Sequence, residues 1–164
     1  MLTKETGKLK IGESGDRSLV MTREFNAPRK LLFDAWTKPE LVKRWLAGPD
    51  GWTMTVCEID LQVGGSYRYE WTHEKGNRMG MGGVYREIVP NELLTATEKF
   101  DESWYPGGAI VTTAFREGGG VTTVETTVTY DSKEARDGVL RSPMESGVAL
   151  GYDRLEKLLA ENFA

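Results

Sequence analysis

Residues 142–159, SPMESGVALGYDRLEKLL, give the clearest structural signal in the chain. Ser142, Pro143 and Glu145 form a helix start, with an N-cap residue, a proline at the first helical position and a glutamate that can reach back. Apolar residues then recur at helical spacing, which predicts an apolar stripe about four and a half turns long. The stripe consists of Met144, Val148, Tyr152, Leu155, Leu158 and Leu159.

The middle of the chain changes to a period of two. We expect strands at 18–25, 52–59, 66–71, 81–89, 93–100, 110–116 and 121–130, separated by short stretches with Gly, Asn or Pro. The connections are too short for crossover helices, so the sheet is predicted to be an antiparallel meander. Two short helices follow the first strand, one opened by Pro28 and one by the capping sequence Thr37-Lys38-Pro39-Glu40.

These elements predict an α+β fold in which a curved antiparallel sheet of about six or seven strands surrounds the long C-terminal helix. A half-buried sheet must cover its apolar face, and only that helix is long enough to do so. Gly64-Gly65 and Gly82-Gly83 can relieve the bending of the sheet. Residues 1–16 are predicted to be a polar N-terminal arm that can include a short strand at 8–11, and residues 17–164 a single domain.

Composition restricts the classes of function. Apolar residues make up 39% of the 164 and charged residues 28%, which is typical of a water-soluble globular protein and suggests a cytoplasmic location. No segment approaches the ~20 apolar residues of a membrane span. The net charge is −4 without a basic stripe, so nucleic acid is not an expected partner. One cysteine and one histidine leave no intrachain disulfide and no multi-cysteine metal site, and we expect no cofactor. The sequence leaves open whether the protein forms a homodimer.

Two glycines interrupt the apolar stripe of the last helix. Gly147 and Gly151 each cost about 0.5–1 kcal/mol relative to alanine inside a helix. One interpretation is close contact between the helix and a strand. The other is a notch that leaves room for a ligand, and the sequence alone does not decide between them.

Aromatic residues on the predicted inner surfaces can line a cavity and still anchor the fold. The candidate ligand-binding residues are Trp45, Tyr69, Trp71, Tyr85, Phe115, Met144, Gly147, Val148, Gly151 and Tyr152. The loops at 46–51 and 101–108, rich in Gly and Pro, are candidates to control access.

Glu87 is the one candidate for a catalytic role. If it points inward from its strand, burial would raise its pKa and it could act as an acid or base beside Tyr69 or Tyr85. A purely structural role is the alternative. His73 is expected to be solvated in a turn, and Cys57 to be a small strand residue without special reactivity.

Several segments, in this order and spacing, carry a family resemblance. They are REFNAPR (23–29), FDAWTKPEL (33–41), RW (44–45), EIDL (58–61), GG (64–65), GVYREI (83–88), Pro90, Gly147 and GYDRL (151–155). With them the chain resembles, over roughly 17–162, the bacterial homologues of the heat-shock protein 90 ATPase activator in the START-like (SRPBCC) superfamily. The resemblance implies a helix-grip fold, START-like or Bet v 1-like, with a cavity between sheet and helix. Leu46 departs from the pattern, since many relatives carry a second aromatic residue after Trp45.

The leading hypothesis for function is a soluble binding protein for a small hydrophobic molecule, lipid-like or aromatic and polyketide-like. The first alternative is a cyclase- or hydrolase-type enzyme that uses Glu87 and a tyrosine of the cavity. The second, implied by the resemblance, is a co-chaperone-like module that binds a chaperone. Fold alone cannot choose among them, because one fold carries many functions.

Overall fold

The computed structural model describes residues 3–6, 8–103, 105 and 107–161. Within these residues the elements are, in chain order, β1 (Thr3–Thr6), β2 (Leu9–Ser14), β3 (Ser18–Phe25), α1 (Arg29–Thr37), α2 (Pro39–Trp45), β4 (Trp52–Ile59), β5 (Ser66–His73), β6 (Arg78–Val89), β7 (Leu93–Phe100), β8 (Ala109–Gly118), β9 (Val121–Tyr130), α3 (Lys133–Arg141) and α4 (Met144–Ala160).

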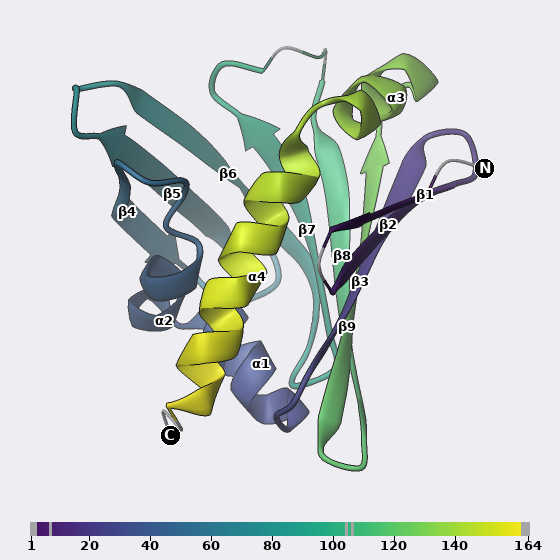
Figure 1. The fold of residues 1–164 in the computed structure, drawn as a ribbon. Coiled ribbons are helices and arrows are strands. Elements are labelled where there is room, and N and C mark those ends of the chain that lie inside the picture. The colour runs from purple at the N-terminus through teal and green to yellow at the C-terminus, as the bar shows by residue number, and fades with distance from the viewer. Residues whose placement is uncertain (1–2, 7, 104, 106, 162–164) are drawn as a thin grey trace.

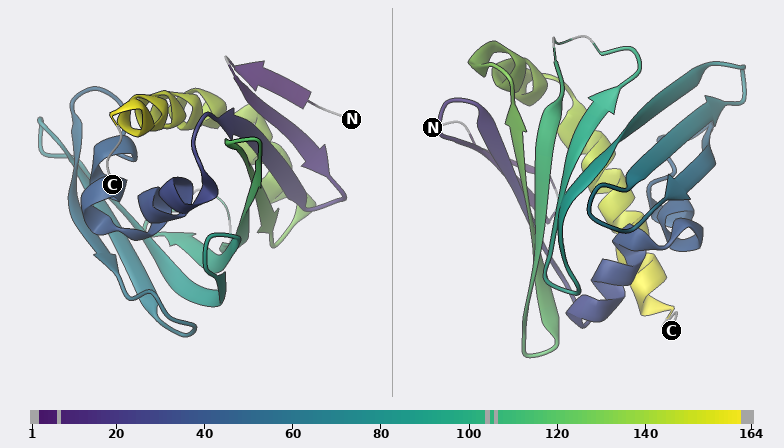
Figure 2. Two further views of the ribbon diagram at one scale, coloured as in Figure 1. Left: turned by 90° about the horizontal axis from the view of Figure 1, so that it is seen from below. Right: turned by 180° about the vertical axis from the view of Figure 1, so that it is seen from behind.

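All the strands of this described part join one antiparallel sheet in the order β1-β2-β3-β9-β8-β7-β6-β5-β4. The sheet curves, and α4 runs across its hollow face while α1 and α2 close one end (Figures 1 and 2). The predicted α+β helix-grip fold is therefore confirmed. The strand count is higher than the six or seven expected, because the described residues form nine strands.

The two unexpected pairings lie in the segment predicted to be a polar arm. Residues 9–14 pair with β3 over the register Lys10↔Thr22 to Ser14↔Ser18, and β1 pairs with β2 at the sheet edge. Leu9 and Ile11 are buried, so the core begins before residue 17. The strand β2 overlaps the short strand suggested at 8–11. The edge strand β1 has few apolar residues and gives little periodic signal, which explains why the sequence pattern did not indicate it.

The contact between α4 and the sheet includes a buried arginine. Arg23 on β3 is only 1% exposed, and its Nη1 donates to Asp153 Oδ1 of α4 at 2.9 Å. Its guanidinium also lies 5.1 Å from the ring centroid of Phe25, which packs edge-on against Tyr152 at 5.5 Å. These contacts fix the middle of α4 against one half of the sheet.

Both predicted capping boxes are wrong. Helix α4 begins at Met144 without a side-chain cap, because Ser142 ends α3 instead and its hydroxyl donates to the Val139 carbonyl at 2.6 Å. The Thr37 hydroxyl likewise donates backward, to the Phe33 carbonyl at 2.8 Å, while Lys38 occupies the N-cap position of α2. In both places one helix ends directly before the next begins, and the hydroxyl group donates to a backbone carbonyl of the earlier helix.

The bend of the sheet depends on glycine at the β6–β7 contact. A Cβ at Gly83 would lie 1.8 Å from the Thr97 carbonyl oxygen, and the Thr97 hydroxyl accepts from the Val84 amide at 2.9 Å. Two residues later, between Tyr85 and Glu87, the register with β7 shifts through a β-bulge. Glycine is therefore required at position 83, where the backbone of β7 lies too close to β6 for a side chain.

Replacing Gly83 with alanine is expected to destabilise the protein by at least about 2 kcal/mol, because the strands must separate to accept the methyl group. Urea unfolding followed by circular dichroism measures the change. Gly118→Ala is the matched control, because nothing lies within 4 Å of the added atom at this strand end. Its effect should stay within about 0.5 kcal/mol. Equal unfolding midpoints for the two variants would contradict this account of the bend.

Candidate functional site

A cavity of about 580 Å³ lies between α4 and the hollow face of the sheet. Its walls come mainly from β5, β6, β7 and the first half of α4, and α2 with the loop after it forms one side. Pro49, Met79 and Gly147 line the cavity and are also exposed. The cavity therefore reaches the surface between α4, the loop at 46–51 and the β5–β6 hairpin.

The two glycines of α4 differ in what surrounds them. No atom lies within 4 Å of a Cβ built at Gly147, whereas one at Gly151 would lie 3.3 Å from the Trp45 carbonyl oxygen. Gly147 is thus a notch at the opening of the cavity, and Gly151 allows α4 to approach α2 closely. The notch interpretation of the sequence therefore applies to Gly147, whereas the close contact at Gly151 is with a helix, α2, and not with a strand as expected.

Aromatic rings on alternating positions of β5 form one wall. Ring centroids of Tyr67 and Tyr69 are 5.0 Å apart, and Tyr67 lies 5.5 Å from Tyr85 on the neighbouring strand β6. The polar tips of the rings bond to backbone carbonyls at the margins. Tyr67 donates to Thr97 O at 2.7 Å, and Trp71 Nε1 donates to Leu46 O at 2.8 Å. The rings themselves line the cavity.

All the candidate ligand-binding residues predicted from the sequence line this cavity, except Phe115. Phe115 is 2% exposed and packs edge-on against Phe33 at 5.7 Å and Trp36 at 5.4 Å. It points to the inner side of the sheet, as its strand position indicates, but α1 covers it. Phe115 is therefore a core residue beneath the first helix.

Glu87 does not lie in the cavity. Its side chain is exposed, although simple alternation from the buried Tyr85 would place it on the same inner face. The β-bulge between these two residues adds one position to β6 and turns Glu87 outward. The structure thus contradicts the orientation on which its predicted acid–base role depends.

The cavity contains a different carboxyl group, that of Glu98 on β7. Leu94, Ala96, Glu98 and Phe100 alternate along this strand, and all four line the cavity. Burial raises the pKa of the Glu98 carboxyl to about 7. The sequence analysis missed this residue, yet the period of two that places Leu94 and Ala96 inside also places Glu98 inside.

The remaining ionisable groups of the region are neutral or lie at the margin. Burial raises the pKa of the Tyr105 and Tyr152 hydroxyls to about 12 and that of Cys57 to about 11, so none ionises near pH 7. Arg154 at the opening donates to the Gly48 carbonyl and lies 3.8 Å from Asp50. In the described part of the chain, no group of His, Cys, Asp or Glu side chains could hold a metal ion.

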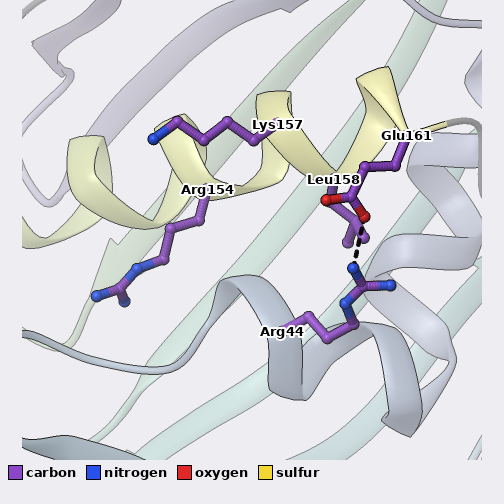
Figure 3. A pocket seen from close by; sticks show the side chains of 5 residues that line it. All are labelled: Arg44, Arg154, Lys157, Leu158 and Glu161. Atoms are coloured by element: carbon purple, nitrogen blue, oxygen red, sulfur yellow. Dashed lines mark hydrogen bonds and ion pairs between the residues drawn. The ribbon is translucent and has the colours of Figure 1, made fainter.

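A second, smaller pocket of about 300 Å³ lies between α2 and the end of α4 (Figure 3). Arg44, Arg154, Lys157, Leu158 and Glu161 line it. Arg44 Nη2 lies 2.6 Å from Glu161 Oε2, so an exposed ion pair joins the two helix ends across it. Exposed pairs of this kind contribute little to stability, and the pocket has no apolar wall beyond Leu158.

The sequence matches the family described as Activator of Hsp90 ATPase homolog 1-like protein over residues 26–160. A crystal structure of a protein from Rhodobacter sphaeroides is similar, with a TM-score of 0.89 and 32% identity over 94% of this chain and 99% of that one. A solution structure from Staphylococcus epidermidis gives 0.79 and 27% over 93% and 94%. A crystal structure from Mycobacterium smegmatis gives 0.82 and 20% over 99% and 100%. No curated protein matches the chain.

Among the described residues, no helix is both long enough and apolar enough to cross a membrane.

The buried carboxyl group predicts how stability depends on pH. The folded protein holds the Glu98 proton up to about pH 7, whereas the unfolded chain loses it near the ordinary value of 4.5. The unfolded state therefore binds fewer protons between these values, and the free energy of unfolding should fall as pH rises through this window. Above pH 7, Glu98→Gln should be more stable than the wild type by roughly 3 kcal/mol.

Urea unfolding at about pH 5 and about pH 8 measures this effect. Glu58→Gln, which changes an exposed glutamate on β4, is the control and should leave the pH dependence as it is in the wild type. A Glu98→Gln protein whose stability changes with pH in parallel with the wild type would show that the carboxyl group is not buried as described.

Proposed function

The chain belongs to the Activator of Hsp90 ATPase homolog 1-like family of the START-like superfamily, and from this membership and the cavity we propose that it binds a small hydrophobic molecule between the sheet and α4. Proteins of this fold family commonly bind hydrophobic ligands. The observation that carries the proposal is an apolar, partly open cavity of about 580 Å³ in the place where a helix-grip fold holds a ligand.

The volume and walls of the cavity support the proposal. Small-molecule sites typically measure about 300–1,000 Å³ and combine apolar walls with a few polar groups. We assign the contacts with the ligand to the cavity residues Trp45, Tyr69, Trp71, Tyr85, Met144, Gly147, Val148, Gly151 and Tyr152. Their rings offer faces for offset stacking, so the proposed ligand is aromatic and polyketide-like or lipid-like.

The other proposed functions have less support. An enzyme that uses Glu87 is not supported, because this side chain is exposed outside the cavity. A co-chaperone role would follow from the family's name alone. We propose a cytoplasmic location and a small molecule as the partner.

Closing the notch is expected to weaken ligand binding without unfolding the protein. Gly147→Leu places a side chain in the opening, where nothing lies within 4 Å of its Cβ, and leucine is the better helix former. The affinity for a neutral probe such as 2-(2-naphthyl)ethanol should fall at least about tenfold, measured by its fluorescence on titration. A probe at a hundredfold excess over its dissociation constant should stabilise the wild type by about 2.7 kcal/mol.

Ser146→Leu adds the same side chain one position earlier, on an exposed residue outside the cavity lining, and should bind like the wild type. Equal affinities of the Gly147→Leu and Ser146→Leu proteins would place the binding site elsewhere. If naphthyl compounds, fatty alcohols and fatty acids all leave the melting temperature of the wild type unchanged, the proposed function fails.

A further inference from the structure

The ionisable side chains that line the cavity, apart from its tyrosines, are Glu98 and Arg154. Arg154 lies at the opening, where the Gly48 carbonyl accepts from it and Asp50 lies nearby. Glu98 lies on the inner face of β7, between Ala96 and Phe100 in the row of residues that line the cavity. The interior of the cavity therefore contains an acidic group and no basic one among the described residues.

No described side chain pairs with the Glu98 carboxyl group. Burial is the cause of its raised pKa, and neither a hydrogen bond nor a nearby cation acts on it. The charge of Glu98 contributes to raising the pKa of the Tyr67 hydroxyl, but this hydroxyl donates to the Thr97 carbonyl at 2.7 Å and not to Glu98. Glu98 is thus an acceptor that lines the cavity and has no partner among the described side chains.

Several tyrosines line the same cavity as this carboxyl group. Its charge contributes to raising the pKa of the Tyr67, Tyr105 and Tyr130 hydroxyls, which come from β5, the β7–β8 loop and β9. The rings of Tyr105 and Tyr130 meet edge to face at 5.3 Å. The faces of aromatic rings are negative and attract cations, so a cavity lined by these rings and by the carboxylate favours a positively charged group.

We propose that Glu98 binds the protonated amine of the ligand, so that the cavity is selective for amphiphilic amines whose apolar part fills the space between the sheet and α4. This inference rests on the proposed function. A buried carboxylate without a partner is costly, and an ammonium group would supply both the missing charge and hydrogen-bond donors. A neutral alcohol could donate one hydrogen bond but would leave the charge unpaired.

Amine binding should therefore be linked to release of a proton. Below about pH 7 Glu98 is protonated, and the amine must displace this proton, so affinity should rise with pH and level off above that value. The tyrosines Tyr67, Tyr69, Tyr85, Tyr105 and Tyr130 that line the cavity stay neutral across this range, since burial raises the pKa of each. Lys99, the next residue of β7, is exposed and is not among the residues that line the cavity.

The test compares two probes of the same size, 2-(2-naphthyl)ethylamine and 2-(2-naphthyl)ethanol, by isothermal titration calorimetry. At about pH 8 the wild type should bind the amine at least about tenfold more tightly than the alcohol. This preference should shrink at least about tenfold on lowering the pH to about 5.5, whereas the affinity for the alcohol should change little.

Glu98→Gln keeps the shape of the side chain and should lose the preference for the amine while it keeps the affinity for the alcohol. Glu58→Gln is the control and should retain the wild-type preference. Equal binding of the two probes to the wild type, or an unchanged preference in the Glu98→Gln protein, would overturn the inference and leave the proposed function standing. If neither probe binds the wild type, the inference fails, and the proposed function fails with it only if fatty alcohols and fatty acids also leave the melting temperature unchanged.

Discussion

A single helix must cover the hollow face of a nine-stranded sheet, and most of the structure follows from this mismatch of widths. Strands lie about 4.8 Å apart, so nine of them span roughly 40 Å along the sheet, whereas a helix with its side chains is about 10–12 Å across. The sheet must curl to bring its inner face toward α4. On the β3 side the helix makes direct contact through Arg23, Tyr152 and Phe25, and on the β5–β7 side a space remains.

That space stays open because hydrogen bonds to the backbone hold the side chains of its walls in place. The indole of Trp71 and the hydroxyl of Tyr67 donate to backbone carbonyls, and these bonds keep the two rings from turning into the cavity. Gly147 leaves the opening without a side chain. Glu98 adds a polar group that an apolar core could not enclose without cost, so the interior suits a guest with both apolar and polar parts.

Much of this could be predicted from the sequence. The apolar stripe of α4 and the alternation of the strands predicted the α+β fold, and most of the candidate residues line the cavity because they lie on those inner faces. Edge strand β1, Thr3–Thr6, was missed because it has no apolar alternation. Glu87 was placed inside because a one-residue bulge cannot be seen in a pattern of period two. The importance of Glu98 depends on the neighbours that the fold brings to it, although its inward position follows from the same alternation as Leu94.

The central claim is that the hollow between α4 and the sheet is an apolar space not filled by side chains. A crystal structure determined under xenon pressure tests this most directly, because xenon enters apolar cavities of this kind. We predict xenon density between Val148 of α4 and the strand residues Tyr69 and Met81. Side chains packed across that space, with no xenon between helix and sheet, would contradict the account.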